Sequence, residues 1–185
     1  MNLPDKRKVE ADFILWFQRR RMFGNDRQTE IVFGESKSFG LDAFQTDDID
    51  RMKILATQFP GSVLVFSTMK PPAELSPEEI QRLTKLAMWG REYVSERRQS
   101  RAPVIILTGI ELFATFSLSS TWEQLGGKHA ELIKPGWVRT DSLRSLADLT
   151  QQLYLGLPSY SEWREEKWKK RKDARDARAA KAKQV

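Results

Sequence analysis

The segment from Ile31 to Gly40, with the sequence IVFGESKSFG, combines an apolar run with an acid and a base two positions apart. The run predicts a strand, and alternate side chains of a strand share a face, so Glu35 and Lys37 lie about 6–7 Å apart along one face. A strand that buries Ile31 and Phe33 has no packing reason to hold a charged pair at its end. We therefore expect this pair to carry chemistry.

A second carboxylate is expected on the preceding strand. Residues 11–19 are rich in β-formers, and a turn signal after them makes 11–38 an antiparallel hairpin. In a hairpin closed near residues 23–25, opposed residues have numbers that sum to about 47–49, so Asp12 falls opposite residue 35 or 37 on the same face. Opposed side chains lie about 5 Å apart, close enough for one metal ion to bridge Asp12 and Glu35.

Two carboxylates and a lysine are suited to metal-dependent cleavage of phosphodiester bonds. The carboxylates supply the hard oxygen ligands that Mg²⁺ prefers, and the lysine can orient or activate the attacking water. A register slip of one residue would turn Asp12 to the opposite face of the sheet and remove this arrangement.

Helices and strands alternate after the hairpin. The expected elements are helices at 46–59 (with Thr46 as its cap), 76–90 and 142–155, strands at 62–67 and 103–109, and irregular structure at 119–141. The two strands are apolar throughout, as in strands that helices cover on both faces. The sequence thus predicts an α/β fold in which a mixed β-sheet has an antiparallel hairpin and parallel strands flanked by helices.

The chain has 185 residues, which predicts one domain over 1–160 with its core at about 10–110. Residues 161–185 form a basic tail, helical or disordered, with ten basic and five acidic side chains. This net charge of +5 is most of the +6 of the whole chain. The domain itself is nearly neutral, so its net charge gives little support for nucleic-acid binding.

Composition excludes several classes of site. There is no cysteine, and His129 is the one histidine, so a disulfide framework, a thiolate zinc site and a paired-histidine metal helix are ruled out. No apolar run approaches the roughly 20 residues of a membrane helix. The first ten residues lack the apolar segment of a signal peptide, so we expect a cytoplasmic protein with no membrane partner.

With Asp12, the hairpin and then Glu35-Ser36-Lys37 at the end of the next strand, the chain resembles the PD-(D/E)XK nuclease superfamily, which has the restriction-endonuclease-like fold. The resemblance covers about residues 10–110. It implies that Asp12 and Glu35 bind Mg²⁺ (or Mn²⁺ in its place) and that the carbonyl of Ser36 can be a further ligand. It also implies that Lys37 positions or activates the water, and that the substrate is nucleic acid, with DNA favoured.

The sequence departs from the family pattern at two points. Ala11 stands where the family often has a proline before the aspartate. The family also places a helix and a strand before this aspartate, and residues 1–10 are too few for both. Either the chain is the C-terminal part of a longer protein or its core is reduced, and further protein segments or a second copy could complete the site.

Two other functions remain open. The domain could be an inactive nuclease-like module that binds nucleic acid or protein within a larger protein, or a structural domain whose tail recruits a partner. The alternative to chemistry at this pair is that Glu35 and Lys37 form a surface ion pair at the end of a strand, which contributes little stability. A second acid-x-lysine triplet, Glu165 to Lys167, is interpreted as part of a solvated helix face.

Weaker candidates lie outside this pair. Glu111 follows the strand at 103–109 and could approach the site, although capping of the next turn is favoured. Lys70 could face a phosphate or be solvated, and His129 is interpreted as a loop residue. The basic side chains of the tail that could contact phosphates are Lys169, Lys170 and Arg171.

Overall fold

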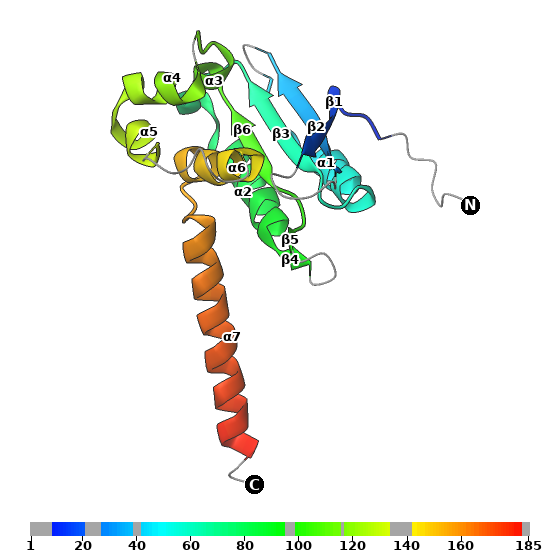
Figure 1. The fold of residues 1–185 in the computed structure, drawn as a ribbon, viewed down its shortest axis with the longest axis vertical. Coiled ribbons are helices and arrows are strands. Elements are labelled where there is room, and N and C mark those ends of the chain that lie inside the picture. Colours follow the sequence, from blue (N-terminus) through cyan, green and yellow to red (C-terminus); the bar gives the residue numbers. More distant parts are fainter. Residues whose placement is uncertain are drawn as a thin grey trace, which may run out of the picture.

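The computed structural model describes residues 9–20, 27–38, 42–94, 99–115, 117–133 and 142–182. Its centre is a four-stranded sheet with the order β1-β2-β3-β6 (Figure 1). The strands are β1 (Phe13–Arg20), β2 (Arg27–Lys37), β3 (Val63–Thr68) and β6 (Val104–Leu107). β1 and β2 are antiparallel, and β2, β3 and β6 run parallel. The predicted α/β class with a mixed sheet is therefore confirmed.

Helices connect and cover these strands. They are α1 (Thr46–Gln58), α2 (Pro77–Arg91), α3 (Gly109–Leu112), α4 (Leu118–Leu125), α5 (Gly127–Leu132), α6 (Ser142–Tyr154) and α7 (Tyr160–Ala182). A 3-10 turn, η1 (Pro72–Glu74), precedes α2, and a two-stranded ribbon of β4 (Tyr93–Val94) and β5 (Gln99–Ser100) follows it. Within the described ranges, no helix is long and apolar enough to cross a membrane.

The sheet is covered on both faces. On one face, Phe33 and Phe66 of the sheet pack with Met52 of α1 and Leu83 of α2. On the other face, Val32, Val65 and Ile105 pack with Ala147 of α6. The strands β3 and β6 are buried along both faces for this reason, as their unbroken apolar runs predict.

The hairpin has the predicted register, although its turn lies outside the described residues. The numbers of opposed residues sum to 47, with Phe13 facing Gly34 and Trp16 facing Ile31. A Cβ atom on Gly34 would lie 1.9 Å from the ring of Phe13, so any larger residue at this position would force the Phe13 ring to move. β1 is the edge strand of the sheet, and Ile14, Leu15 and Trp16 are exposed there.

Two expectations about the helices were wrong. Thr46 is the first residue of α1, not its cap; Gln45 is the cap, in a capping box with Asp48. Residues 119–141 were expected to be irregular, but α4 and α5 occupy much of this range. Ser117 caps α4, Trp122 anchors it in the core, and Gly126 with φ of +70° separates it from α5, so the glycine pair marks a helix boundary.

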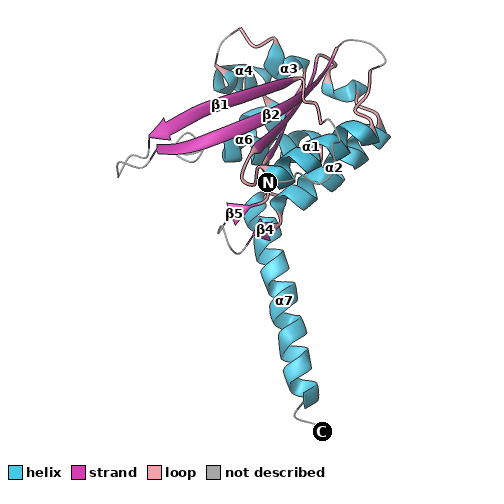
Figure 2. Cartoon of the chain, turned by 90° about the vertical axis from the view of Figure 1, so that its right-hand side faces the viewer, coloured by secondary structure: helices cyan, strands magenta, loops and turns pink. Residues whose placement is uncertain are grey.

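The described part of the tail is helical from Tyr160 to Ala182, as one of the two alternatives for it predicted. Figures 1 and 2 show α7 leaving the domain beside α6 and extending away from the sheet. Its start is fixed because the Tyr160 N–H donates to Asp148 of α6 at 2.8 Å. Asp148 is also paired with Arg91 of α2 at 3.1 Å, so three helices meet at this carboxylate.

Candidate active site

Glu35 and Lys37 stand at the end of β2 and form the expected pair. Lys37 Nζ donates to Glu35 Oε1 at 2.9 Å. The two residues differ in burial, because Glu35 is 2% exposed while Lys37 keeps 20% of its side chain exposed. A weak surface ion pair would need a solvated carboxylate, and Glu35 is too deeply buried for that alternative.

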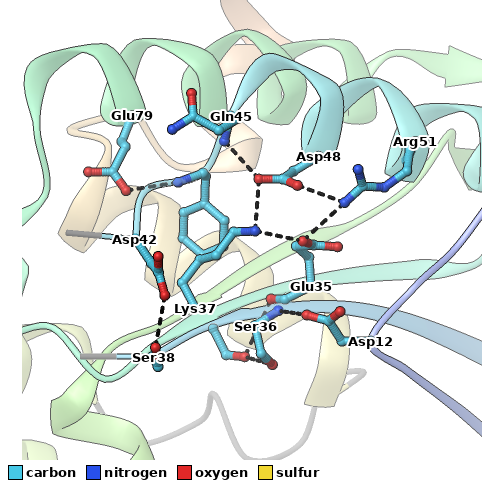
Figure 3. A network of polar contacts seen from close by, with 12 residues as sticks. Asp12, Glu35, Ser36, Lys37, Ser38, Asp42, Gln45, Asp48, Arg51 and Glu79 are labelled. Atoms are coloured by element: carbon cyan, nitrogen blue, oxygen red, sulfur yellow. Dashed lines mark hydrogen bonds and ion pairs between the residues drawn. The ribbon is translucent and has the colours of Figure 1, made fainter. Parts of the chain in front are cut away.

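Helix α1 brings a second ion pair to this place, which is not among the residues predicted from the sequence. Asp48 accepts from Lys37 Nζ at 3.0 Å and from Arg51 Nη2 at 2.7 Å, and Arg51 Nη2 also lies 3.2 Å from Glu35 Oε1. Figure 3 shows the two carboxylates and two cations joined in one network between the end of β2 and the first turns of α1. We call Glu35, Lys37, Asp48 and Arg51 the Glu35 cluster.

The sequence does contain a signal for Asp48. Asp48, Met52 and Leu55 follow the i, i+4, i+7 spacing of one helix face, and all three are buried. The helix dipole accounts for an acid in the first turn, but the place of Asp48 in an apolar row also indicates a buried polar contact. The N–H of Gln45 fixes its carboxylate by donating to Oδ2 at 2.8 Å.

The cluster shifts the protonation of its members in different directions. Burial raises the pKa of the Glu35 carboxyl, and the nearby Asp48 adds to the rise against the opposing hydrogen bond from Lys37. Burial would also raise the pKa of Asp48, but the Gln45 N–H and Lys37 outweigh it and hold that pKa below its usual value. Glu35 is thus the carboxyl of the pair that takes up a proton more readily.

Lys37 remains a cation. Burial would lower the pKa of its ammonium group, but the hydrogen bonds to Glu35 and Asp48 outweigh burial and raise it. For Arg51 the attraction of the same two carboxylates likewise exceeds the effect of burial, so its pKa is raised as well. Two negative and two positive groups therefore face one another, and the cluster is formally neutral when Glu35 is ionised.

Two buried atoms of the cluster, Glu35 Oε2 and Arg51 Nε, have no hydrogen-bond partner among the described residues, and the carboxylate oxygen is the one that could bind a ligand. Both cations bind Glu35 through Oε1, and Oε2 is buried with no hydrogen-bond donor among the described residues. A buried carboxylate oxygen without a donor costs free energy, of the order of 1–3 kcal/mol or more for a charged group. Such an atom requires an explanation, and a ligand or an ordered water would provide one.

Asp12 lies beside the Glu35-Ser36-Lys37 triplet. Its Oδ2 accepts from the Ser36 N–H at 2.6 Å, and its own N–H donates to the Gly34 carbonyl at 2.9 Å. Figure 3 shows the Asp12 carboxylate at the main chain of Ser36, while the Glu35 side chain is directed toward Asp48 and Arg51. The structure thus brings Asp12 to the triplet, but none of its hydrogen bonds reaches the Glu35 carboxylate.

The oxygen atoms at this place are of the chemical kind that binds a divalent cation. No group of three or more acidic, histidine or cysteine side chains that could hold a metal is found in the part of the chain that the structure describes. Mg²⁺ keeps several waters and binds through one or two carboxylates, so it does not need such a group. Glu35 Oε2, which lacks a donor, the exposed Asp12 and the Ser36 carbonyl are oxygen atoms of the kind it prefers.

The weaker candidates lie elsewhere. Lys70 is 6% exposed, and its Nζ lies 3.9 Å from Glu79. The alternative of a solvated lysine is therefore wrong, and the side chain is not available for a phosphate contact. Glu111 caps α3, as the favoured interpretation predicted. His129 is within α5, not in a loop, and its ring lies 5.8 Å from that of Trp122.

The tail residues Lys169, Lys170 and Arg171 are exposed on α7, which extends away from the sheet (Figure 1). Lys170 pairs with Glu166 one turn earlier, at 2.7 Å. These side chains therefore do not belong to the Glu35 cluster, and any contact they make with nucleic acid is made outside it.

Comparisons of the chain with protein-family models, with curated proteins and with solved structures found no match. The function is accordingly argued from the Glu35 cluster and Asp12.

Proposed function

We propose that this chain is a metal-dependent nuclease that hydrolyses phosphodiester bonds in DNA. The observation that carries the proposal is the Glu35 carboxylate, which is buried at the end of β2 with one oxygen lacking a partner and a lysine on the other. The confirmed hairpin register, which puts Asp12 beside this triplet, supports it further. A cytoplasmic location is part of the same proposal.

In this proposal Asp12, Glu35 and the Ser36 carbonyl hold Mg²⁺. The metal, when bound, polarises a phosphate oxygen and makes its water more acidic. Lys37 acts as a cation, since its raised pKa keeps it protonated, so it orients the attacking water and balances charge on the phosphate without removing a proton. Asp48 and Arg51 are positioning residues that hold Lys37 and Glu35 in place.

One observation favours a second function. The Glu35 cluster is closed, because Lys37 and Arg51 already neutralise both carboxylates. A network of this kind can be structural, in which case the domain is a nuclease-like module that binds nucleic acid or protein without cleaving. This candidate predicts that the intact protein has no Mg²⁺-dependent nuclease activity.

The test is cleavage of plasmid and single-stranded DNA with Mg²⁺ and with EDTA. Lys37→Ala is expected to lower the rate by about 10²–10⁴-fold. Lys85→Ala, at an exposed lysine of α2, is the matched control and should cleave as the wild type does. Asp12→Asn should raise the Mg²⁺ concentration needed for half-maximal cleavage.

Removal of Lys37 leaves two buried carboxylates with Arg51 as their one remaining cation, so the experiment includes Lys37→Arg. This variant keeps the positive charge and the fold but changes the shape of the donor, and we expect it to be strongly impaired. Circular dichroism establishes folding for each variant. Equal activity in the wild type and in both Lys37 variants, or none in any protein, would contradict the proposal.

A further inference from the structure

Helix α7 is attached firmly at its start. Trp163 is 8% exposed, and its ring packs 5.6 Å from that of Tyr160. Lys167 pairs with Glu92, which follows α2, and lies over the Trp163 ring. The first two turns are therefore held on the domain, and they fix the direction in which the remainder of the helix extends.

The charges of α7 are unevenly distributed around the helix. Residues three and four apart share a helix face, and one such row contains only basic residues. This row, which we call the basic stripe, is Arg164, Lys167, Arg171, Arg175 and Arg178, and an opposite row contains the acids Glu162, Glu166, Asp173 and Asp176. Separation of charge along 15 residues gives the helix one strongly positive side.

The basic stripe is accessible. Apart from Lys167, each of its members is exposed, and Arg175 keeps 77% of its side chain in solvent although its Nε lies 3.8 Å from Asp176. Its four arginines span 15 residues, or about 21 Å of helix from the first to the last. Figure 2 shows the part of α7 beyond its first two turns away from every other element. A row of planar, always charged guanidinium groups suits phosphates, which they bind in a bidentate manner.

The composition of α7 favours a polyanion over a partner helix as its ligand. A partner helix would need an apolar row, but Trp168 is the one large apolar side chain exposed on the described part of α7. Duplex DNA carries a phosphate charge about every 1.7 Å along its axis, and its major groove accommodates a helix. A straight helix with regularly spaced arginines complements such a rigid, regular array better than a flexible single strand.

We propose that α7 is a DNA-binding arm whose basic stripe contacts the phosphates of duplex DNA without reading its sequence. This binding is independent of cleavage, because the stripe lies outside the Glu35 cluster. The stripe contains Arg171 but excludes Lys169, which shares the face of the acids.

The test is fluorescence anisotropy of the full chain with a mixed-sequence duplex in EDTA, so that no cleavage interferes. At about 50 mM salt, Arg171→Gln/Arg178→Gln should weaken binding by roughly tenfold and lower the slope of log affinity against log salt by about 2. The matched control, Lys169→Gln/Lys172→Gln, removes the same charge off the stripe and should change affinity less than twofold. Equal helicity of the variants by circular dichroism shows that α7 persists.

Several results would overturn the proposal. These are equal weakening by both double variants, absence of duplex binding by the intact chain at low salt, or tighter binding of a single strand than of the duplex. A fourth is self-association, detected by sedimentation velocity, that the Arg171→Gln/Arg178→Gln variant loses while its DNA affinity is unchanged. Loss of nuclease activity by itself affects none of these measurements, so the two proposals fail separately.

Discussion

Glu35 and Glu111 stand at the carboxyl-terminal edge of the parallel strands, and their surroundings differ. Glu111 receives four hydrogen bonds: the Thr108 N–H and hydroxyl donate to Oε2, and Trp122 Nε1 and the Tyr154 hydroxyl donate to Oε1. Glu35 receives its contacts from two cations on one oxygen, and its other oxygen has no donor among the described residues.

This difference distinguishes a structural carboxylate from one that can still bind a ligand. Neutral donors saturate Glu111, which joins α3, α4 and α6 and has no oxygen left for a ligand. The Tyr154 hydroxyl is committed to this role, because burial and the nearby Glu111 raise the pKa of the phenol. Glu35 combines burial, charge and an unused oxygen, which is the combination expected of a ligand site.

The largest expected difference between Glu35 and Glu111 is in cleavage activity. Glu35→Gln removes the charge that would bind the metal and should lower Mg²⁺-dependent cleavage by about 10²–10³-fold. Glu111→Gln makes the same chemical change in the saturated cluster and should leave the rate per folded molecule within about twofold. Single-turnover cleavage of a plasmid measures both; a similar loss in the two variants would remove the distinction.

A smaller effect is expected on stability when Glu111 loses one of its donors. Tyr154→Phe removes one donor from Glu111 and should lower the free energy of unfolding by about 1–3 kcal/mol, with little effect on cleavage. Urea denaturation provides the value. Unchanged stability would show that the Tyr154 hydroxyl is dispensable and that Glu111 is not saturated in solution.

The smallest effect concerns pH. The folded-state pKa of Glu35 is raised above 4.5, so the folded protein binds this proton more tightly than the unfolded chain does. The contribution of Glu35 to stability is therefore greatest below pH 4.5 and falls as the pH rises from there to the folded-state pKa. We expect the stability of the wild type relative to Glu35→Gln to decrease as the pH rises from about 4.5 toward neutrality.

This prediction is checked by urea denaturation of both proteins in EDTA across that range. Asp48 has the opposite sign: its lowered pKa contributes stability above 3.8 that is lost as the pH falls further. Because Asp48 is present in both proteins, its contribution largely cancels in the difference. A difference that is independent of pH would show that Glu35 is not desolvated.

The order of the central elements could be predicted because local signals are strong there. Ser76, Pro77 and Glu79 form a capping box at the start of α2 in the structure, as their spacing predicts. The short helices α4 and α5 could not be predicted in the same way. They are stabilised by burial of Trp122 and by contacts with distant residues, and the local sequence shows neither. The glycine pair between the two helices instead indicates a loop.

The sequence by itself determined the alternation of strands and helices, the hairpin register and the pairing of Glu35 with Lys37. Periods of two and of three to four residues and turn signals are local properties, so they can be seen in the chain. Only the tertiary structure decided that Asp48 and Arg51 join Glu35, that Glu35 is left with an unused oxygen and that Lys70 is buried. These depend on where a helix lies over a sheet, and that position follows from the packing of the whole core.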